Sequence, residues 1–131
     1  MQRLLYILVY PIWWGVSILP MPVLYILSDV FFFLTYYVIG YRRKVVKENL
    51  ALTLPNKTEQ ERKQIAKEFY AHLCDILVET IKSLTISKKE INRRFKFENP
   101  EILQELYDQD KSVLLMCGHY ASWEWSGIVT Q

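Results

Sequence analysis

The first forty residues almost lack charge, because Arg3 and Asp29 are the only charged side chains there. The whole chain of 131 residues has 16 basic and 14 acidic residues, so nearly all of its charge follows residue 40. The net charge of +2 is small, and no basic stripe is interleaved with aromatic residues, which argues against nucleic-acid binding. Cysteine is also scarce. Cys74 and Cys117 are too few for a disulfide scaffold, so we expect reduced thiols in the cytosol.

The uncharged region contains two apolar stretches, residues 4–19 and 23–41, separated by "PMP". The second is nearly as long as the roughly 20 residues with which a helix crosses the hydrocarbon core. Tyrosine and tryptophan are abundant in both, as in the interfacial belt of membrane proteins. The motif "YRRKVVK" follows at once, and its cations favour the cytoplasmic side and attract anionic headgroups. We therefore expect residues 1–41 to anchor the chain in a membrane. The alternative is a hydrophobic helical hairpin buried in a larger soluble protein.

Capping patterns predict most of the helices after residue 42. Thr58 and Glu61 have the Ser/Thr-x-x-Glu spacing and precede apolar residues at helical spacing, which predicts a long amphipathic helix over 59–84. Ser87 and Glu90 repeat the pattern for a shorter helix. Asn99 and a following proline predict another helix, through residue 107. An earlier helix is expected to end at "LPN", residues 54–56.

Two segments are predicted to be strands. "RFKFEN", residues 94–99, alternates apolar and polar side chains, and "SVLLMC", residues 112–117, is an unbroken apolar run typical of a strand covered on both faces. With a final helix from about Ser122, the order is helices and then β-α-β-α. This order predicts an α/β domain with a mainly parallel sheet and a right-handed crossover. Because two strands are too few for such a sheet, we expect the N-terminal portion of a larger domain.

The segment "CGHYASWEW", residues 117–125, holds His119 and Glu124 five positions apart. On one regular helix their side chains would diverge by roughly 140°. They can meet only if His119 precedes the helix and Glu124 lies in its first turn. Gly118 permits a tight exit from the preceding segment, and Ser122 is a suitable N-cap.

A carboxylate bonded to one imidazole nitrogen fixes the tautomer and supports the cation that forms when the other nitrogen takes a proton. The pair therefore has the chemistry of a general base whose nucleophile is a substrate hydroxyl. Cys117 offers an alternative, because a Cys-His nucleophile would indicate a thioester hydrolase or a ping-pong transferase. The apolar run before Cys117 favours a buried, inert thiol instead. The only other histidine, His72, is not at metal-ligand spacing, and we expect no metal and no cofactor.

The segment "GHYASWEW" resembles the His-x4-acid motif of the glycerolipid acyltransferase superfamily. It is more specifically similar to the Gly-His-Phe-Gly-Asn-Trp-Glu version in bacterial lipid A biosynthesis acyltransferases. The upstream segments "GYRRKVVKENLALTLPN" and "FYAHL" also resemble that family's N-terminal region in content and order. Two positions depart from its pattern: Ala121 replaces a glycine and Ser122 replaces an asparagine. Both replacements are small or able to cap a helix, so we expect an altered acceptor or acyl fit before a loss of chemistry.

The resemblance implies an acyltransferase whose acyl donor is an acyl carrier protein thioester and whose acceptor is a hydroxyl of a lipid A precursor or a related glycolipid. His119 would be the general base and Glu124 its partner, with Gly118, Ser122 and Trp123 next to substrate. Residues 42–131 would be the N-terminal part of the acyltransferase domain. The family also implies the bacterial inner membrane, with the active site facing the cytoplasm.

Other interpretations remain open at this point. The chain could be a membrane-tethered interaction module without chemistry, or an acyltransferase for another glycolipid or a lysophospholipid. Trp123 and Trp125 could line an acyl or membrane-facing surface or belong to a core. His72 is expected to be structural. Arg93, Arg94 and Lys96 could attract an acidic carrier protein or lipid phosphates, although a solvated face is the simpler explanation.

Overall fold

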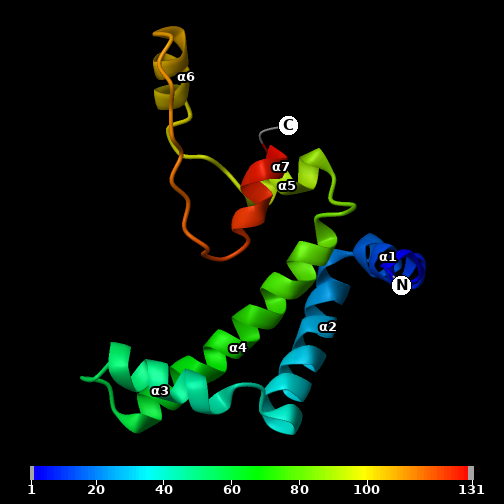
Figure 1. Cartoon of the computed structure of the whole chain (residues 1–131), viewed down its shortest axis with the longest axis vertical. Helices are drawn as coiled ribbons and strands as arrows, with labels where there is room; N and C mark the ends of the chain where they lie inside the picture. Colours follow the sequence, from blue (N-terminus) through cyan, green and yellow to red (C-terminus); the bar gives the residue numbers. More distant parts are fainter. Residues whose placement is uncertain (1, 130–131) are drawn as a thin grey trace. The chain divides into compact units, whose positions relative to one another are not determined.

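The computed structural model of the protein describes residues 2–129. They form two compact units, Met1–Thr85 and Ile86–Gln131. The division into residues 1–41 and 42–131 was predicted from hydropathy and stays a prediction, because packing contacts do not report on membrane insertion. The elements of the first unit are α1 (Gln2–Ile18), α2 (Met21–Phe33), the π-helical turn η1 (Leu34–Ile39), α3 (Arg43–Thr53) and α4 (Glu59–Lys82) (Figure 1). Those of the second are α5 (Lys88–Arg94), α6 (Glu101–Asp108), the 3-10 turn η2 (Trp123–Trp125) and α7 (Ser126–Val129).

The predicted α/β fold with a parallel sheet is wrong: residues 2–129 contain helices and no strand. Residues 95–97 and 111–118 lack regular secondary structure, and the apolar side chains of residues 113–116 are exposed. A strand exists only through hydrogen bonds to a neighbouring strand, and neither segment makes such a ladder within the described residues. The sequence patterns of both segments suit a strand in a sheet. Neither pattern identifies the neighbouring strand with which the segment would pair.

The predicted capping box of the long helix is confirmed. Thr58 Oγ1 accepts a hydrogen bond from the Glu61 backbone N–H at 3.2 Å, and the Glu61 carboxylate accepts one from the Thr58 N–H at 2.8 Å. The predicted cap at Ser87 is confirmed as well, since its Oγ accepts from the Glu90 N–H. At α6 the N-cap is Pro100, and Asn99 lies just outside the helix with φ +53°.

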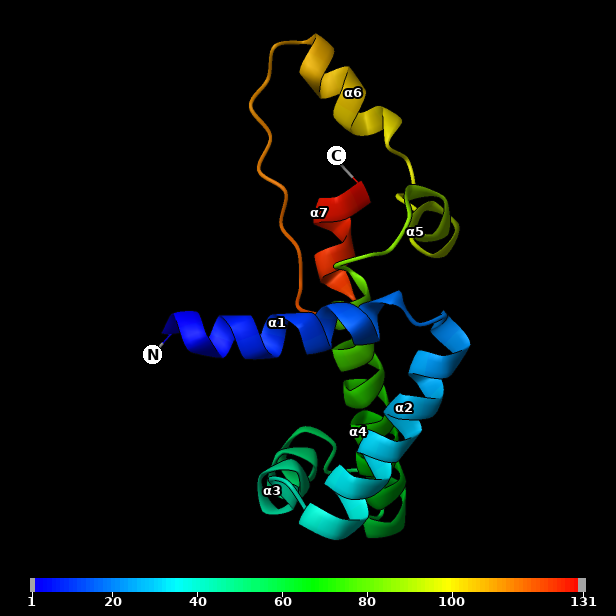
Figure 2. The same ribbon diagram turned by 90° about the vertical axis from the view of Figure 1, so that its right-hand side faces the viewer.

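The first unit is organised around the packing of α2 along α4, which lie side by side in both ribbon views (Figures 1 and 2). Leu24 of α2 and Val78 of α4 are completely buried. Two polar contacts join the same helices: Ser28 Oγ donates to Asp75 Oδ1 at 2.7 Å, and the Tyr25 hydroxyl donates to Glu79 Oε1 at 2.7 Å. Such pairs hold α2 and α4 in register, because a buried hydroxyl without a partner costs free energy.

Lys82 connects the end of α1 to α4. Its Nζ donates to the backbone oxygens of Ser17 at 2.8 Å and Leu19 at 3.0 Å, where the last carbonyls of a helix lack partners inside the helix. The cation also lies where the negative end of the α1 dipole favours it. The Thr85 hydroxyl also donates to the Ser17 carbonyl, so two side chains at and beyond the end of α4 hold the end of α1.

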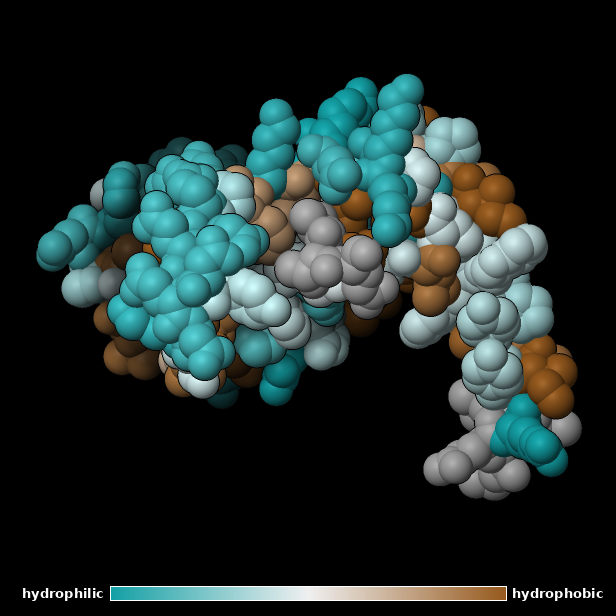
Figure 3. All heavy atoms as spheres, turned by 90° about the horizontal axis from the view of Figure 1, so that it is seen from above, coloured by the Kyte–Doolittle hydropathy of each residue, from teal (hydrophilic) through white to brown (hydrophobic). Residues whose placement is uncertain are grey.

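The outer surfaces of α1 and α2 are apolar and exposed. Residues 21–39, which run from α2 through η1, form a helical segment of 19 residues that is long and apolar enough to cross a membrane, and most of it is exposed. In Figure 3, brown hydrophobic side chains reach the surface along the arm at the lower right, which is α1. Contiguous exposed apolar surface of this kind marks membrane or protein contacts. The exposed residues of α2 and η1 include Val23, Ile26, Val30, Phe33, Val38 and Ile39.

Candidate active site

His119 lies in the second unit, at the end of the extended segment that leads into η2, and its side chain is exposed. The chain turns around it, since the Tyr120 N–H donates to the Gly118 carbonyl at 2.9 Å. Glu124 is in η2, so its place in the first turn after the N-cap position at Ser122 is as expected from the spacing. The Ser122 side chain makes no capping hydrogen bond.

The aromatic neighbour of His119 is Trp123. The two ring centroids are 4.5 Å apart, and the ring planes are inclined by 55°. The imidazole therefore lies against the indole of Trp123. Trp123 was expected to lie next to substrate; the structure places it beside the proposed base, where it restricts the orientation of the imidazole.

Trp125 anchors the turn. It is 4% exposed, and Ser122, three residues before it, is 9% exposed, whereas Trp123 and Glu124 are exposed. Of the two interpretations of Trp125, the structure therefore favours packing over an acyl-binding surface. A buried indole gives a large hydrophobic contribution. The buried Trp125 holds in place the turn that carries Glu124.

The strained residue of this turn is Ala121, with φ +50°. The left-handed region costs a residue with a Cβ roughly 1–2 kcal/mol relative to glycine. Gly118, which was expected to need conformational freedom, is not among the residues with positive φ, and a Cβ on it would meet nothing within 4 Å. The backbone conformation that favours glycine is therefore at position 121 and not at position 118.

A sequence model of one family, described as bacterial lipid A biosynthesis acyltransferase, matches residues 1–131. The chain belongs to this family. No curated protein and no solved structure matches it. The resemblance of "GHYASWEW" and the upstream segments to lipid A acyltransferases is thereby confirmed at the level of the family.

Position 121 holds an alanine where both the resemblance and the backbone conformation favour glycine. A lipid A acyltransferase carries glycine there by the resemblance described above, and the structure has a left-handed residue at that position. In this chain Ala121 adopts the conformation that glycine would adopt without strain. An Ala121→Gly substitution would therefore relieve this backbone strain.

The expectation that the Cys117 thiol is buried is wrong. Cys117 is exposed, and Cys74 on α4 is the buried cysteine; both are free. Burial raises the pKa of the Cys74 thiol, so Cys74 is the unreactive one of the two. The alternative of a Cys117 nucleophile beside His119 therefore remains to be tested by mutation.

The remaining polar candidates lie on α4 and in or just after α5. His72 is exposed on α4. Arg93 and Arg94 both bind Glu90, with Nη2 and Nε at 2.8 and 2.7 Å from Oε1, and these contacts lower the pKa of the Glu90 carboxyl. This arrangement supports a solvated face of α5. Within residues 2–129, no three His, Cys, Asp or Glu side chains are arranged to hold a metal ion.

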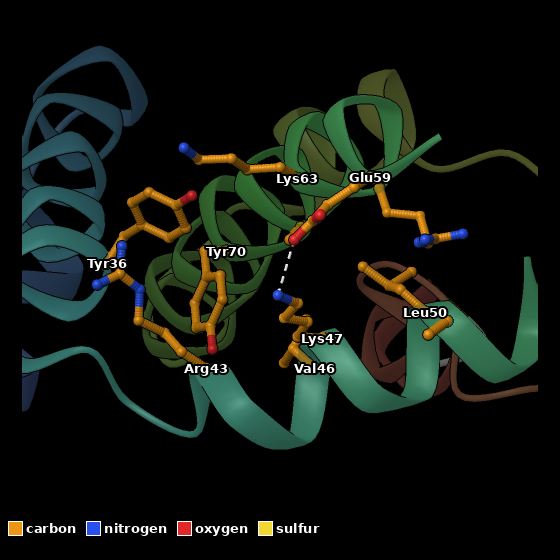
Figure 4. Close-up of a pocket in the computed structure, with 11 residues that line it drawn as sticks. Tyr36, Arg43, Val46, Lys47, Leu50, Glu59, Lys63 and Tyr70 are labelled. Carbon is orange, nitrogen blue, oxygen red and sulfur yellow. Dashed lines mark hydrogen bonds and ion pairs between the residues drawn. The ribbon is translucent and has the colours of Figure 1, made fainter. Parts of the chain in front are cut away.

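The first unit contains a cavity of about 320 Å³ between α3 and α4, bordered by Tyr36 of η1 (Figure 4). Four cationic side chains, one carboxylate and two tyrosines line it, together with small apolar residues. Sequence reasoning missed this site. The signal was present in the four-residue spacing of Arg43 and Lys47, which places them on one face of a helix, but the sequence does not show that this face meets α4.

Proposed function

We propose that the protein transfers a fatty acyl chain from an acyl carrier protein thioester to a hydroxyl of a lipid A precursor or a related glycolipid. The observation that carries the proposal is the match of the lipid A acyltransferase family to the whole chain. The exposed His119 in a turn that continues into Glu124 supports it, because a general base must be reachable by the hydroxyl that it deprotonates.

In the proposed reaction His119 removes the proton of the acceptor hydroxyl, and the hydroxyl oxygen attacks the thioester carbonyl carbon. The carbon–sulfur bond then breaks, and the carrier thiolate leaves and takes up a proton. An ester and a free carrier thiol are the products. No metal or redox partner enters this balance of atoms and electrons.

Glu124 is proposed to accept a hydrogen bond from the second imidazole nitrogen and to stabilise the imidazolium. In this structure the imidazole contacts the indole of Trp123, which limits the orientations from which it can donate to the carboxylate. Catalytic hydrogen bonds often tighten only when substrate is bound. Ser122, Gly118 and Trp123 are proposed to lie next to substrate.

The site of action is proposed to be the cytoplasmic face of the bacterial inner membrane. The exposed apolar segment at residues 21–39 supports membrane attachment. The cations that follow it, Arg42, Arg43 and Lys44, support the cytoplasmic side.

The test is acyl transfer by the full-length protein from a labelled acyl carrier protein to a lipid A precursor. We expect His119→Ala to lower the rate about 10²–10⁴-fold without a change in thermal unfolding, because the side chain is exposed. His72→Ala is the matched control: it removes the other histidine, which is also exposed, and should leave the rate unchanged. A near-normal rate for His119→Ala would refute the assignment.

A second candidate, a Cys117 nucleophile, is favoured by one observation, the exposure of that thiol. Cys117→Ala separates the two mechanisms. We expect the variant to retain transfer. Loss of transfer, together with an acyl-enzyme trapped on the wild-type thiol, would instead establish a ping-pong mechanism.

A further inference from the structure

The cavity of the first unit has an unusual lining for a space between two helices. Arg43 and Lys47 project from α3, Lys63 projects from α4, and Tyr36 closes one side (Figure 4). Glu59 is the only carboxylate among the residues that line it. The cavity therefore has an excess of positive charge beside aromatic and apolar surface. Such a lining is complementary to an anion that carries an organic group.

The four cations that line the cavity differ in the contacts that they make with other protein groups. Lys47 Nζ is 2.7 Å from Glu59 Oε1, and this contact lowers the pKa of the Glu59 carboxyl. The fourth cation, Arg62, donates to the backbone oxygens of Leu54 and Lys57. It thereby satisfies carbonyls in and beside the turn that follows α3.

Arg43 is held in place by aromatic contacts. Its guanidinium carbon is 4.8 Å from the centre of the Tyr36 ring, a cation–π geometry. Tyr36 in turn meets Tyr70 edge-on with ring centres 5.4 Å apart, and the Tyr70 hydroxyl donates to the Tyr41 carbonyl. The guanidinium is thus preorganised at the cavity, because its partners are buried and fixed.

The backbone directly before α3 places this cation cluster next to the apolar segment. Gly40 has φ +66°, and a Cβ there would lie 3.1 Å from Arg43 Cδ. Arg42 is also left-handed, with φ +51°. The chain therefore turns sharply between η1 and α3. Since Tyr36 belongs to the segment 21–39 and also lines the cavity, the cavity is continuous with the end of that segment.

We infer that this cavity binds the phosphate of an anionic glycerophospholipid, whose acyl chains lie against the exposed apolar surface of residues 21–39. A phosphate accepts hydrogen bonds from guanidinium and ammonium groups. Headgroups are found where an apolar segment ends in a run of cations. The cavity belongs to the first unit and His119 to the second, and occupation of the cavity does not depend on the proposed acyl transfer.

The test is lipid binding by the full chain in a neutral detergent, in which no charged bilayer surface attracts the protein generally. The probes are phosphatidylglycerol, phosphatidylcholine and inorganic phosphate, and the readout is lipid retained after gel filtration as a function of lipid added. We expect phosphatidylglycerol to be retained in preference to phosphatidylcholine. Inorganic phosphate should compete only weakly, because it lacks the acyl chains.

Two charge-matched double variants locate the site. Arg43→Gln with Lys63→Gln removes two cavity cations and should weaken phosphatidylglycerol binding about tenfold or more. Lys67→Gln with Lys89→Gln removes two exposed cations that lie outside both the cavity lining and the cation run after residue 41, and should leave binding within about twofold of wild type. Thermal unfolding of each variant checks that the fold is retained, and Lys63→Arg, which keeps the charge, should bind as wild type.

A further variant is expected to change lipid binding in the opposite direction. Glu59→Gln removes the carboxylate and releases Lys47 from its ion pair, so phosphatidylglycerol binding should strengthen. Equal weakening by the two double variants would overturn the cavity as the site. Equal retention of phosphatidylcholine would overturn the requirement for an anion, and strong competition by inorganic phosphate would establish a soluble-phosphate site in place of a lipid site.

Discussion

The two units of the chain are built differently. In Met1–Thr85 the long helix α4 packs against α2, and the interface combines completely buried apolar residues with hydroxyl–carboxylate contacts. In Ile86–Gln131 the helices are short, residues 111–118 lack regular secondary structure, and residues 111–120 are exposed. The second unit nevertheless carries His119 and Glu124, the proposed catalytic pair. The comparison shows that the region with the most packing is not the region with the proposed catalytic chemistry, as is common when reactive residues lie in loops.

Hydrogen exchange should show the largest difference between the units. Amides in the middle of α4 should be protected up to the free energy of global unfolding, which is about 5–15 kcal/mol for ordinary domains. Amides of residues 112–117 should exchange at nearly unprotected rates, because their N–H groups have no backbone partner within the described part of the chain. Exchange measured by mass spectrometry in detergent is the check. Strong protection of residues 112–117 would break the comparison.

Truncation of the α2–α4 core should have the next largest effect. Leu24 is completely buried, so Leu24→Ala should destabilise the first unit by about 2–5 kcal/mol. The matched control is Ile26→Ala, on the same helix and 64% exposed, which should change stability by less than about 0.5 kcal/mol. Thermal unfolding in detergent measures both. Similar losses for the two variants would contradict the observed packing face of α2.

Removal of a helix cap should destabilise the two units to different extents. Thr58→Ala removes the cap of the 24-residue α4 and should cost about 1 kcal/mol of the stability of the first unit. Ser87→Ala removes the same kind of cap from the seven-residue α5. Its effect should be smaller in thermal unfolding and visible chiefly as faster exchange within α5, because a short helix frays locally. An equal shift of the main transition by both variants would show that the units unfold together.

The smallest expected effect is the pH dependence contributed by Glu61. Its pKa is lowered to about 2, first by the hydrogen bond from the Thr58 backbone and then by those from Lys57 and the Thr58 hydroxyl. A carboxyl with a depressed pKa in the folded state stabilises the fold above its ordinary pKa, 4.5, and loses this contribution as pH falls toward about 2.

The stability difference between wild type and Glu61→Gln should therefore shrink over the same pH range. Thermal unfolding of both proteins from pH 5 down to about pH 2 measures it. A difference that stays constant across this range would show that the carboxylate adds nothing to the cap beyond what an amide supplies.

The sequence predicted well those features that depend on neighbours along the chain. Thr58 and Glu61 are three residues apart, and their reciprocal hydrogen bonds form wherever a helix begins. The turn between His119 and Glu124 was likewise inferred from spacing, and Glu124 does lie in the first turn after Ser122. The sheet was predicted wrongly, because an apolar run such as residues 112–117 resembles a strand without specifying any partner.

The chain alone determined its family, its helix starts and the apolar character of residues 21–39, since motif spacing, capping and hydropathy are local properties of the residues. Tertiary structure alone decided that Trp123 is the ring beside His119, that Cys117 is exposed, and that Arg43 and Lys63 line one cavity. These features depend on which surfaces meet in space. Residues twenty positions apart share a site only when two helices pack, and packing is a property of the whole fold.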